Sequence, residues 1–151
     1  MALAIALHVL SAVIWVGGMF FAYMALRPAV AEVVDAAHRG TLWCHTLNRF
    51  FRWVWGAVIV LLVTGYWMMF TAFGGMAGAG WHIHAMQAGG LLMMLLFAHV
   101  YFAPFRRLKQ AVAAHNPEEG GRRVGQIRKL VGVNLTLGLI VVVIGSAGRY
   151  L

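Results

Sequence analysis

Four uncharged apolar runs, separated by polar segments, set the limits on what this chain can fold into. They extend over residues 2–26, 53–73, 81–105 and 130–148. A helix needs roughly 20 residues to cross about 30 Å of hydrocarbon, and lipid offers the backbone no other hydrogen-bond partners. The pattern therefore predicts an all-α polytopic membrane protein. We expect an antiparallel bundle of four transmembrane helices that forms one domain over residues 1–151.

Composition supports lipid as the solvent for these runs. The chain is 62% hydrophobic and 11% charged, whereas a soluble domain is about 45–50% apolar and about 25% charged. A soluble fold of this length would bury only about 70% of the surface that its unfolded chain exposes. Cys44 is the single cysteine, so an internal disulfide and a Cys-x-x-Cys site are excluded. A soluble enzyme, a disordered chain and a disulfide scaffold are therefore excluded.

The basic residues predict the orientation of the bundle. The net charge is +8, and all Lys and Arg residues except Arg149 lie in segments 27–52 and 106–129. The glycine-rich segment 71–80 carries none. Because positive residues favour the cytoplasmic side, both termini and segment 71–80 are expected outside a bacterial-type cytoplasmic (inner) membrane. Their position beside apolar runs indicates contact with the lipid bilayer rather than with nucleic acid.

Several short segments predict where the helices extend and where they end. Residues 41–52 and 105–115 contain no strong helix breaker, so they should extend the second and third spans beyond the membrane. Pro28 predicts a kink or stop after the first span, and both 116–117 and 120–121 predict breaks before the fourth.

A stripe of small residues runs along the fourth span and predicts close helix packing. Its members are spaced by three or four residues, on one helical face, and are Asn134, Gly138, Val141, Gly145 and Gly148. Gly18, Gly56, Gly89 and Gly90 in the other spans could serve likewise.

Histidines inside the spans are the main candidates for a functional site, because ionisable residues are costly in lipid. At a rise of about 1.5 Å per residue, His8 lies about 9 Å to the outer side of the first span's centre. In the third span, His84 lies about 15 Å outward and His99 about 8 Å inward. His8 and His84 therefore share a leaflet, whereas His99 belongs to the opposite one.

The helical pattern predicts that these histidines face the interior of the bundle. His84 and His99 fall on one broad face of the third span, with Leu91 and Leu95 between them. His8 shares a face of the first span with Ser11 and Trp15. We expect a polar seam with one histidine group near each membrane face.

Imidazole and thioether groups favour copper, and imidazole also binds haem iron. The candidate metal ligands are His8, His82, His84, His99 and Met86, and the candidate cofactor-binding residues are His8, His84 and His99. All Asp and Glu residues lie in the predicted cytoplasmic segments, so ordinary acid–base catalysis is not expected. The residues alone do not separate copper from haem b.

Motifs along the chain resemble the copper resistance D (CopD) family of membrane proteins. They are Leu7–His8, Trp15–Phe21, Arg27–Pro28, Arg49–Phe51, Thr64–Gly65, His84–Gln87, His99–Pro104, Asn134 and Gly148–Tyr150. The resemblance implies a copper-handling protein that accepts copper at the outer face through His8 and His84 and passes it inward through His99. A periplasmic copper carrier would be its partner.

A weaker resemblance, to the haem-binding HemJ proteins, implies an alternative. His8 matches their first-span histidine, and His84 occupies the position of their third-span lysine. A His/His pair would suit haem b, with quinone as an electron-transfer partner. A third reading is a structural or assembly factor whose histidines only pack. The oligomeric state is also open, with a homodimer as one arrangement.

Overall fold

Every regular element in the computed structural model, which describes residues 1–148 and 150, is helical. The elements are α1 (Ala2–Phe21), η1 (Ala22–Leu26), α2 (Arg27–Val33), α3 (Ala36–Ala72), η2 (Met76–Gly78), α4 (Trp81–Val100), η3 (Tyr101–Phe105), α5 (Arg106–Ala113) and α6 (Pro117–Ala147). η1 and η3 are π-helical turns that join their neighbours into continuous helices. Within the described residues, four helices are long and apolar enough to span a membrane: Ala2–Val33, Ala36–Ala72, Trp81–Ala113 and Pro117–Ala147.

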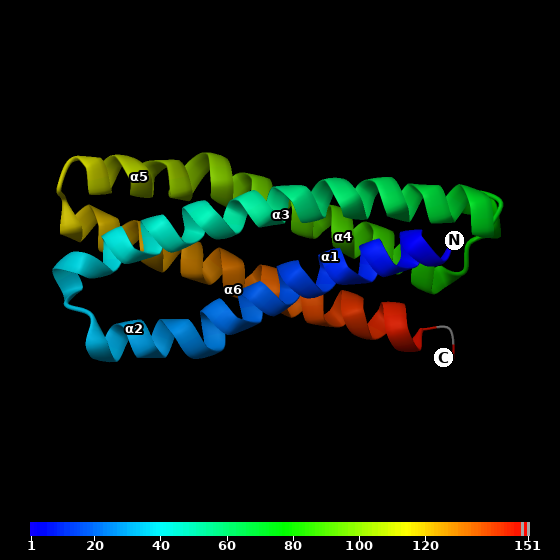
Figure 1. The fold of residues 1–151 in the computed structure, drawn as a ribbon, viewed down its shortest axis with the longest axis horizontal. Helices are drawn as coiled ribbons and strands as arrows, with labels where there is room; N and C mark the ends of the chain where they lie inside the picture. Colours follow the sequence, from blue (N-terminus) through cyan, green and yellow to red (C-terminus); the bar gives the residue numbers. More distant parts are fainter. Residues whose placement is uncertain (149, 151) are drawn as a thin grey trace.

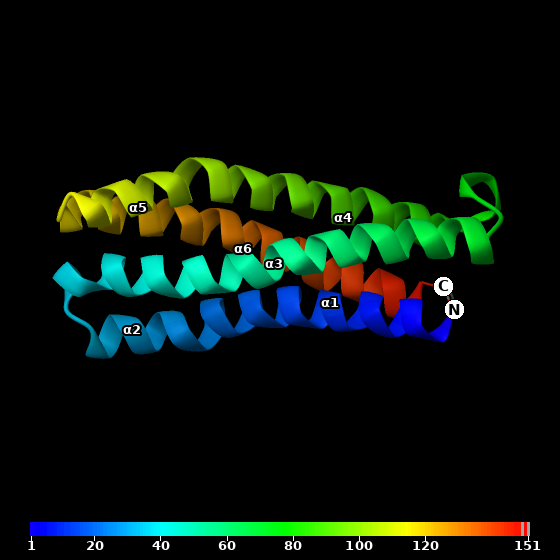
Figure 2. The ribbon, with the colours of Figure 1, turned by 45° about the horizontal axis from the view of Figure 1, so that its top comes forward.

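These four helices form the predicted antiparallel bundle (Figures 1 and 2). α1 packs on α3, and α4 packs on α6, while α3 and α6 also contact each other. The loop between α3 and α4 lies at the same end as the N-terminus and the end of α6. α2, α5 and the start of α6 lie at the opposite end. The basic segments 27–52 and 106–129 therefore gather at one end, called the basic end below; Arg149 lies outside the described residues.

The helices are longer than the apolar runs, as the sequence predicted for two of them. α3 begins at Ala36 and α5 continues α4 to Ala113. Pro28 does not stop the first helix, because it follows the π-turn η1 and stands in the first turn of α2. A proline lacks an N–H and would clash with the preceding turn of a regular α-helix, and the π-turn is the local departure from regular geometry at this point.

The predicted break at Gly120 and Gly121 is wrong. α6 begins at Pro117, where the Asn116 side chain accepts a hydrogen bond from the Glu119 amide at 3.0 Å, and continues through both glycines. Gly120 instead allows two helices to touch. A Cβ on Gly40 of α3 would lie 3.6 Å from the Cα of Gly120.

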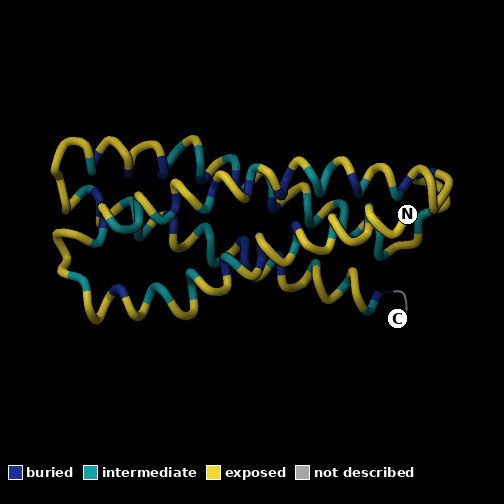
Figure 3. Tube along the Cα trace, viewed as in Figure 1, coloured by how far each residue is buried: buried dark blue, intermediate teal, exposed yellow. Residues whose placement is uncertain are grey.

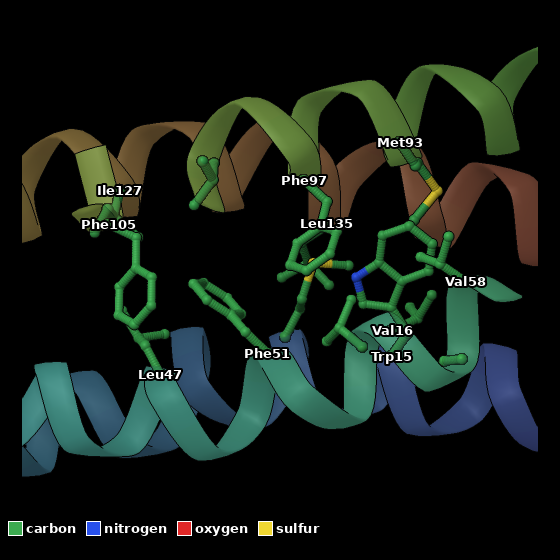
Figure 4. Close-up of a cluster of buried hydrophobic side chains, with 14 of the residues drawn as sticks. Trp15, Val16, Leu47, Phe51, Val58, Met93, Phe97, Phe105, Ile127 and Leu135 are labelled. Atoms are coloured by element: carbon green, nitrogen blue, oxygen red, sulfur yellow. The ribbon is translucent and has the colours of Figure 1, made fainter. Parts of the chain in front are cut away.

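Buried positions lie where the helices face one another (Figure 3). The core they form is an aromatic cluster that joins three helices (Figure 4). The ring of Phe97 on α4 lies 6.0 Å from that of Trp15 on α1 and 5.3 Å from that of Phe51 on α3, both edge-to-face. Phe51 also meets Phe105 at 4.9 Å between ring centroids. Such pairs add about 0.5–1.5 kcal/mol each beyond the area they bury. The centre of the bundle is therefore fixed by large rings rather than by ion pairs.

Small residues bring α6 close to its neighbours, as the stripe predicted. A Cβ on Gly138 would lie 2.9 Å from Met93 Cε and 3.0 Å from Val16 Cγ2. On α4, a Cβ on Gly89 would lie 2.5 Å from Val141 Cγ2. These glycines are packing positions, because side chains of other helices already occupy the space beside them.

Candidate metal centre

His8 on α1 is held by α3. Its Nδ1 lies 2.8 Å from the hydroxyl oxygen of Thr64, a residue that is buried within α3. Ser11 and Trp15, on the same face of α1, are also buried. The predicted inward-facing side of the first span is therefore confirmed for these residues.

The hydrogen bonds of Thr64 determine which nitrogen of His8 carries the proton. A hydroxyl has one hydrogen, and Thr64 donates it to the backbone carbonyl of Val60 at 2.6 Å. Thr64 must then accept from His8, so Nδ1 is the protonated nitrogen of the neutral ring. The lone pair of Nε2 is left available, which is the arrangement that fixes a histidine as a metal ligand.

Gly65 makes room for the same ring. A Cβ at this position would lie 3.3 Å from Cε1 of His8. Thr64 and Gly65 thus form a seat for one imidazole, the first by a hydrogen bond and the second by the absence of a side chain. Reasoning on histidines missed this seat, although a Thr-Gly pair inside an apolar run was visible as a signal.

His82 and Met86, in the first turns of α4, pack against the end of α6. A Cβ on Gly148 would lie 2.7 Å from Cβ of His82, and a Cβ on Gly145 would lie 3.1 Å from the sulfur of Met86. His82 and Met86, both candidate ligands, therefore pack against the glycine stripe of α6.

His84 and His99 occupy the outer face of α4, so the prediction that they face the interior is wrong. Both are exposed, as are Leu91 and Leu95 between them. The reason lies in the packing of α4, which turns Met93, Phe97 and other large side chains inward instead. A helical wheel groups residues that share a face, but it does not say which face the neighbours cover.

The described residues do not bring together a closed metal site within one chain. No group of three or more His, Cys, Asp or Glu side chains in this part of the molecule is arranged to hold a metal. Nor do α1 and α4 pack closely, since each of them lies mainly against another helix. What the fold offers is a set of imidazole and thioether groups on α1 and the start of α4.

The four long apolar helices define a class of protein, a polytopic integral membrane protein. Comparison with protein families then shows which one. Residues 44–147, from α3 to the last turn of α6, match the family "Copper resistance protein D" (CopD), and the chain belongs to that family. No curated protein and no solved structure matches the chain. The matched range includes Thr64, Met86 and the histidines of α4, whereas His8 precedes it.

Proposed function

We propose that this CopD-family membrane protein accepts copper at the end of the bundle formed by the α3–α4 loop and passes it toward the basic end. Membership of the copper resistance family is the observation that carries the proposal. The chemistry of the loop end supports it, because imidazole and thioether groups are ligands that copper prefers, above all as Cu(I). These groups belong to His8, His82, His84 and Met86.

In this proposal, different residues capture the copper ion and retain it. His84 is exposed in the first turn of α4, where an incoming ion or a periplasmic copper carrier can reach it. His8 offers Nε2 from a ring that Thr64 and Gly65 hold in place. His99 lies fifteen positions beyond His84, about 22 Å farther along the helix axis, and would receive the ion on the inner side.

The position of the basic segments supports an orientation for this route. Segments 27–52 and 106–129 form one end of the bundle, and the loop without Lys or Arg lies at the other. The positive-inside rule then places the basic end in the cytoplasm of a bacterial-type inner membrane, with the termini and the α3–α4 loop outside. Copper captured at the loop end would therefore come from the periplasm.

The experiment compares cells that carry the full chain with His8→Ala and His84→Ala variants. We expect copper in the membrane fraction and copper tolerance to change in both, since each variant removes one imidazole ligand. His115→Ala is the matched control, because this histidine is exposed at the basic end. Equal copper content in all four strains would overturn the proposal. Purified protein with a Soret band that is lost in His8→Ala would favour haem b instead.

A second copy of the chain is the partner we propose for the outer face of α4. In lipid, an exposed His99 finds no hydrogen-bond partner, and this residue lies about 8 Å from the middle of its span. A two-fold axis along the membrane normal places each residue beside its own copy at equal depth. A neutral imidazole has one donor and one acceptor, so two copies of His99 can satisfy each other.

A further inference from the structure

An open groove lies between the first long helix and α6, on the side of the basic end. α1 and α6 contact each other, but toward the basic end the two helices diverge, so that α2 lies apart from the start of α6 (Figures 1 and 2). The groove has a volume of about 590 Å³. It is lined by Phe20, Tyr23 and Met24 on one side and by six residues between Lys129 and Leu139 of α6 on the other. This volume is in the range of sites that hold a small molecule.

The walls of the groove are apolar over the depth of one membrane leaflet. Lys129 directly precedes the fourth apolar run, and from there to Leu139 the axis of α6 rises about 15 Å, half of the roughly 30 Å of hydrocarbon. The exposed side chains of the groove include Phe20, Met24 and Val133. The groove therefore matches one acyl chain in length and in polarity.

Two cations stand where this groove reaches the basic end. Arg27 directly follows the first apolar run and Lys129 directly precedes the fourth, so both lie at the same edge of the hydrocarbon. Tyr23 lies between them: the guanidinium carbon of Arg27 is 5.1 Å from the centre of its ring, and a Cβ on Gly132, one turn after Lys129, would lie 3.3 Å from its hydroxyl oxygen. Neither cation takes part in an ion pair with another described residue.

The chemistry of the groove selects an anionic head and a hydrocarbon tail. None of the described residues that line it is acidic, so nothing there repels a phosphate. Anionic phospholipids place their phosphate at this edge of the hydrocarbon, where they attract Lys and Arg. A neutral quinone would leave both cations without a partner, and a zwitterionic lipid would bring a positive charge of its own toward them.

We propose that this groove binds one anionic phospholipid from the leaflet at the basic end. Its phosphate lies between Arg27 and Lys129, and one acyl chain follows the apolar wall toward Leu139. Bound there, the lipid links the first helix to α6 where the two diverge. The inference stands independently of the proposed copper function.

The test uses the purified full-length protein in a neutral detergent, with phosphatidylglycerol as the anionic lipid and phosphatidylcholine as the zwitterionic one. Native mass spectrometry counts the lipids that stay bound. We expect one tightly bound phosphatidylglycerol per chain, and Lys129→Gln should weaken its binding about fivefold, the effect of one cation at an anionic lipid surface. Arg128→Gln is the matched control, because it removes the same charge from an exposed neighbouring residue that does not line the groove. Equal retention of the two lipids, or equal losses in the two variants, would overturn the proposal.

A second variant tests the groove itself while both cations remain. Thr136→Phe places a ring inside the groove and should abolish the binding of phosphatidylglycerol. Val142→Phe, on another face of α6, should retain it. Both positions are exposed, so both variants should fold, and circular dichroism checks this. If Thr136→Phe retains the lipid as the wild type does, the lipid binds elsewhere and the inference is wrong.

Discussion

Nδ1 of His8 lies 2.8 Å from Oγ1 of Thr64, so a histidine of one membrane helix is oriented by a hydroxyl of the next. The hydroxyl also donates to the carbonyl of Val60 within its own helix. Because its one hydrogen is donated to Val60, the Thr64 hydroxyl can only accept a hydrogen bond from the imidazole. A threonine that is hydrogen-bonded to its own helix therefore determines the direction in which the unprotonated Nε2 of His8 points.

The Thr64→Val variant tests this arrangement. Without the Thr64 hydroxyl, neither the orientation nor the tautomer of the His8 ring is fixed. The affinity of His8 for copper should therefore fall by about 10–100-fold, the usual cost of losing such an orienting partner. Thr64→Ser should retain the affinity. Thr71→Val is the control, because Thr71 makes the same bond to its own helix, at 2.8 Å to Trp67, without a histidine. Nitrogen-15 shifts of the His8 ring report the tautomer directly, and an unchanged spectrum in Thr64→Val would contradict the assignment.

Two adjacent glycines of α4 provide a test of the packing. Gly89→Ala should destabilise the bundle by about 1–3 kcal/mol, because the new Cβ collides with the stiff side chain of Val141. Gly90→Ala should be neutral or stabilise by about 0.5–1 kcal/mol, because no described atom lies within 4 Å of its Cβ. Unfolding in detergent, followed by circular dichroism, measures both. Equal stability of the two variants would show that α4 is rotated from the position described.

Single cysteines report the orientation. In a Cys44→Ser background, Ala77→Cys in the α3–α4 loop should react with a membrane-impermeant maleimide in intact cells. Ala114→Cys, after α5, should react only once the membrane is permeabilised. Both alanines are exposed, so the comparison depends on sidedness rather than on burial. The reverse labelling pattern would place the basic end outside.

Cross-linking in the same background tests the second copy on α4. Leu95→Cys should form a disulfide-linked dimer of the purified protein, since the proposed two-fold dimer would place it beside its own copy. Val13→Cys on α1 should not. The two positions are matched, because both lie near the middle of their spans and are 69% and 61% exposed. We further expect His99→Leu to weaken the Leu95→Cys cross-link and His99→Gln, which keeps a donor and an acceptor, to preserve it. Similar yields at Leu95 and Val13 would indicate random collision.

The start of α6 should respond to acid. Hydrogen bonds from Arg123 and then from Arg122 hold the pKa of the Glu119 carboxyl below its ordinary value of 4.5. Glu119 precedes the apolar run, so it titrates in water. A lowered pKa means that this contact stabilises the folded helix end above pH 4.5, and that the effect is lost as pH falls through the lowered pKa. Amide exchange in the first turn should therefore rise in acid, and Glu119→Gln should remove the pH dependence.

Much of the fold followed from the apolar runs and the basic residues, because each of these is a local property of the chain. Lipid leaves a run of this length few options, so the helices and the bundle were predictable. The helix through Gly120 was not, since its glycine serves a contact with Gly40, far away in sequence. The local helix propensity of Gly120 predicted a helix break, whereas tertiary packing requires a small residue at this position.

The candidate site shows a similar division. Periodicity correctly grouped His8 with Ser11 and Trp15, and it also grouped His84 with His99. It could not tell that the second group faces outward, because this depends on which side of α4 its neighbours cover. Nor could it connect His8 with Thr64, fifty-six positions away. The sequence identifies which side chains can bind a metal, whereas the residues that contact them depend on how the helices pack in the bundle.

The contact between Gly40 and Gly120 has a mechanical consequence. The two backbones approach so closely near the basic end that they cannot come closer, so a tilt between α3 and α6 would pivot about this contact. From Gly40, α3 extends for about 48 Å to Ala72 at the rise of an α-helix. A tilt of only about 5° at the contact would then displace the loop end of α3 by about 4 Å. A small movement on one side of the membrane would thus be magnified where the histidine seat lies.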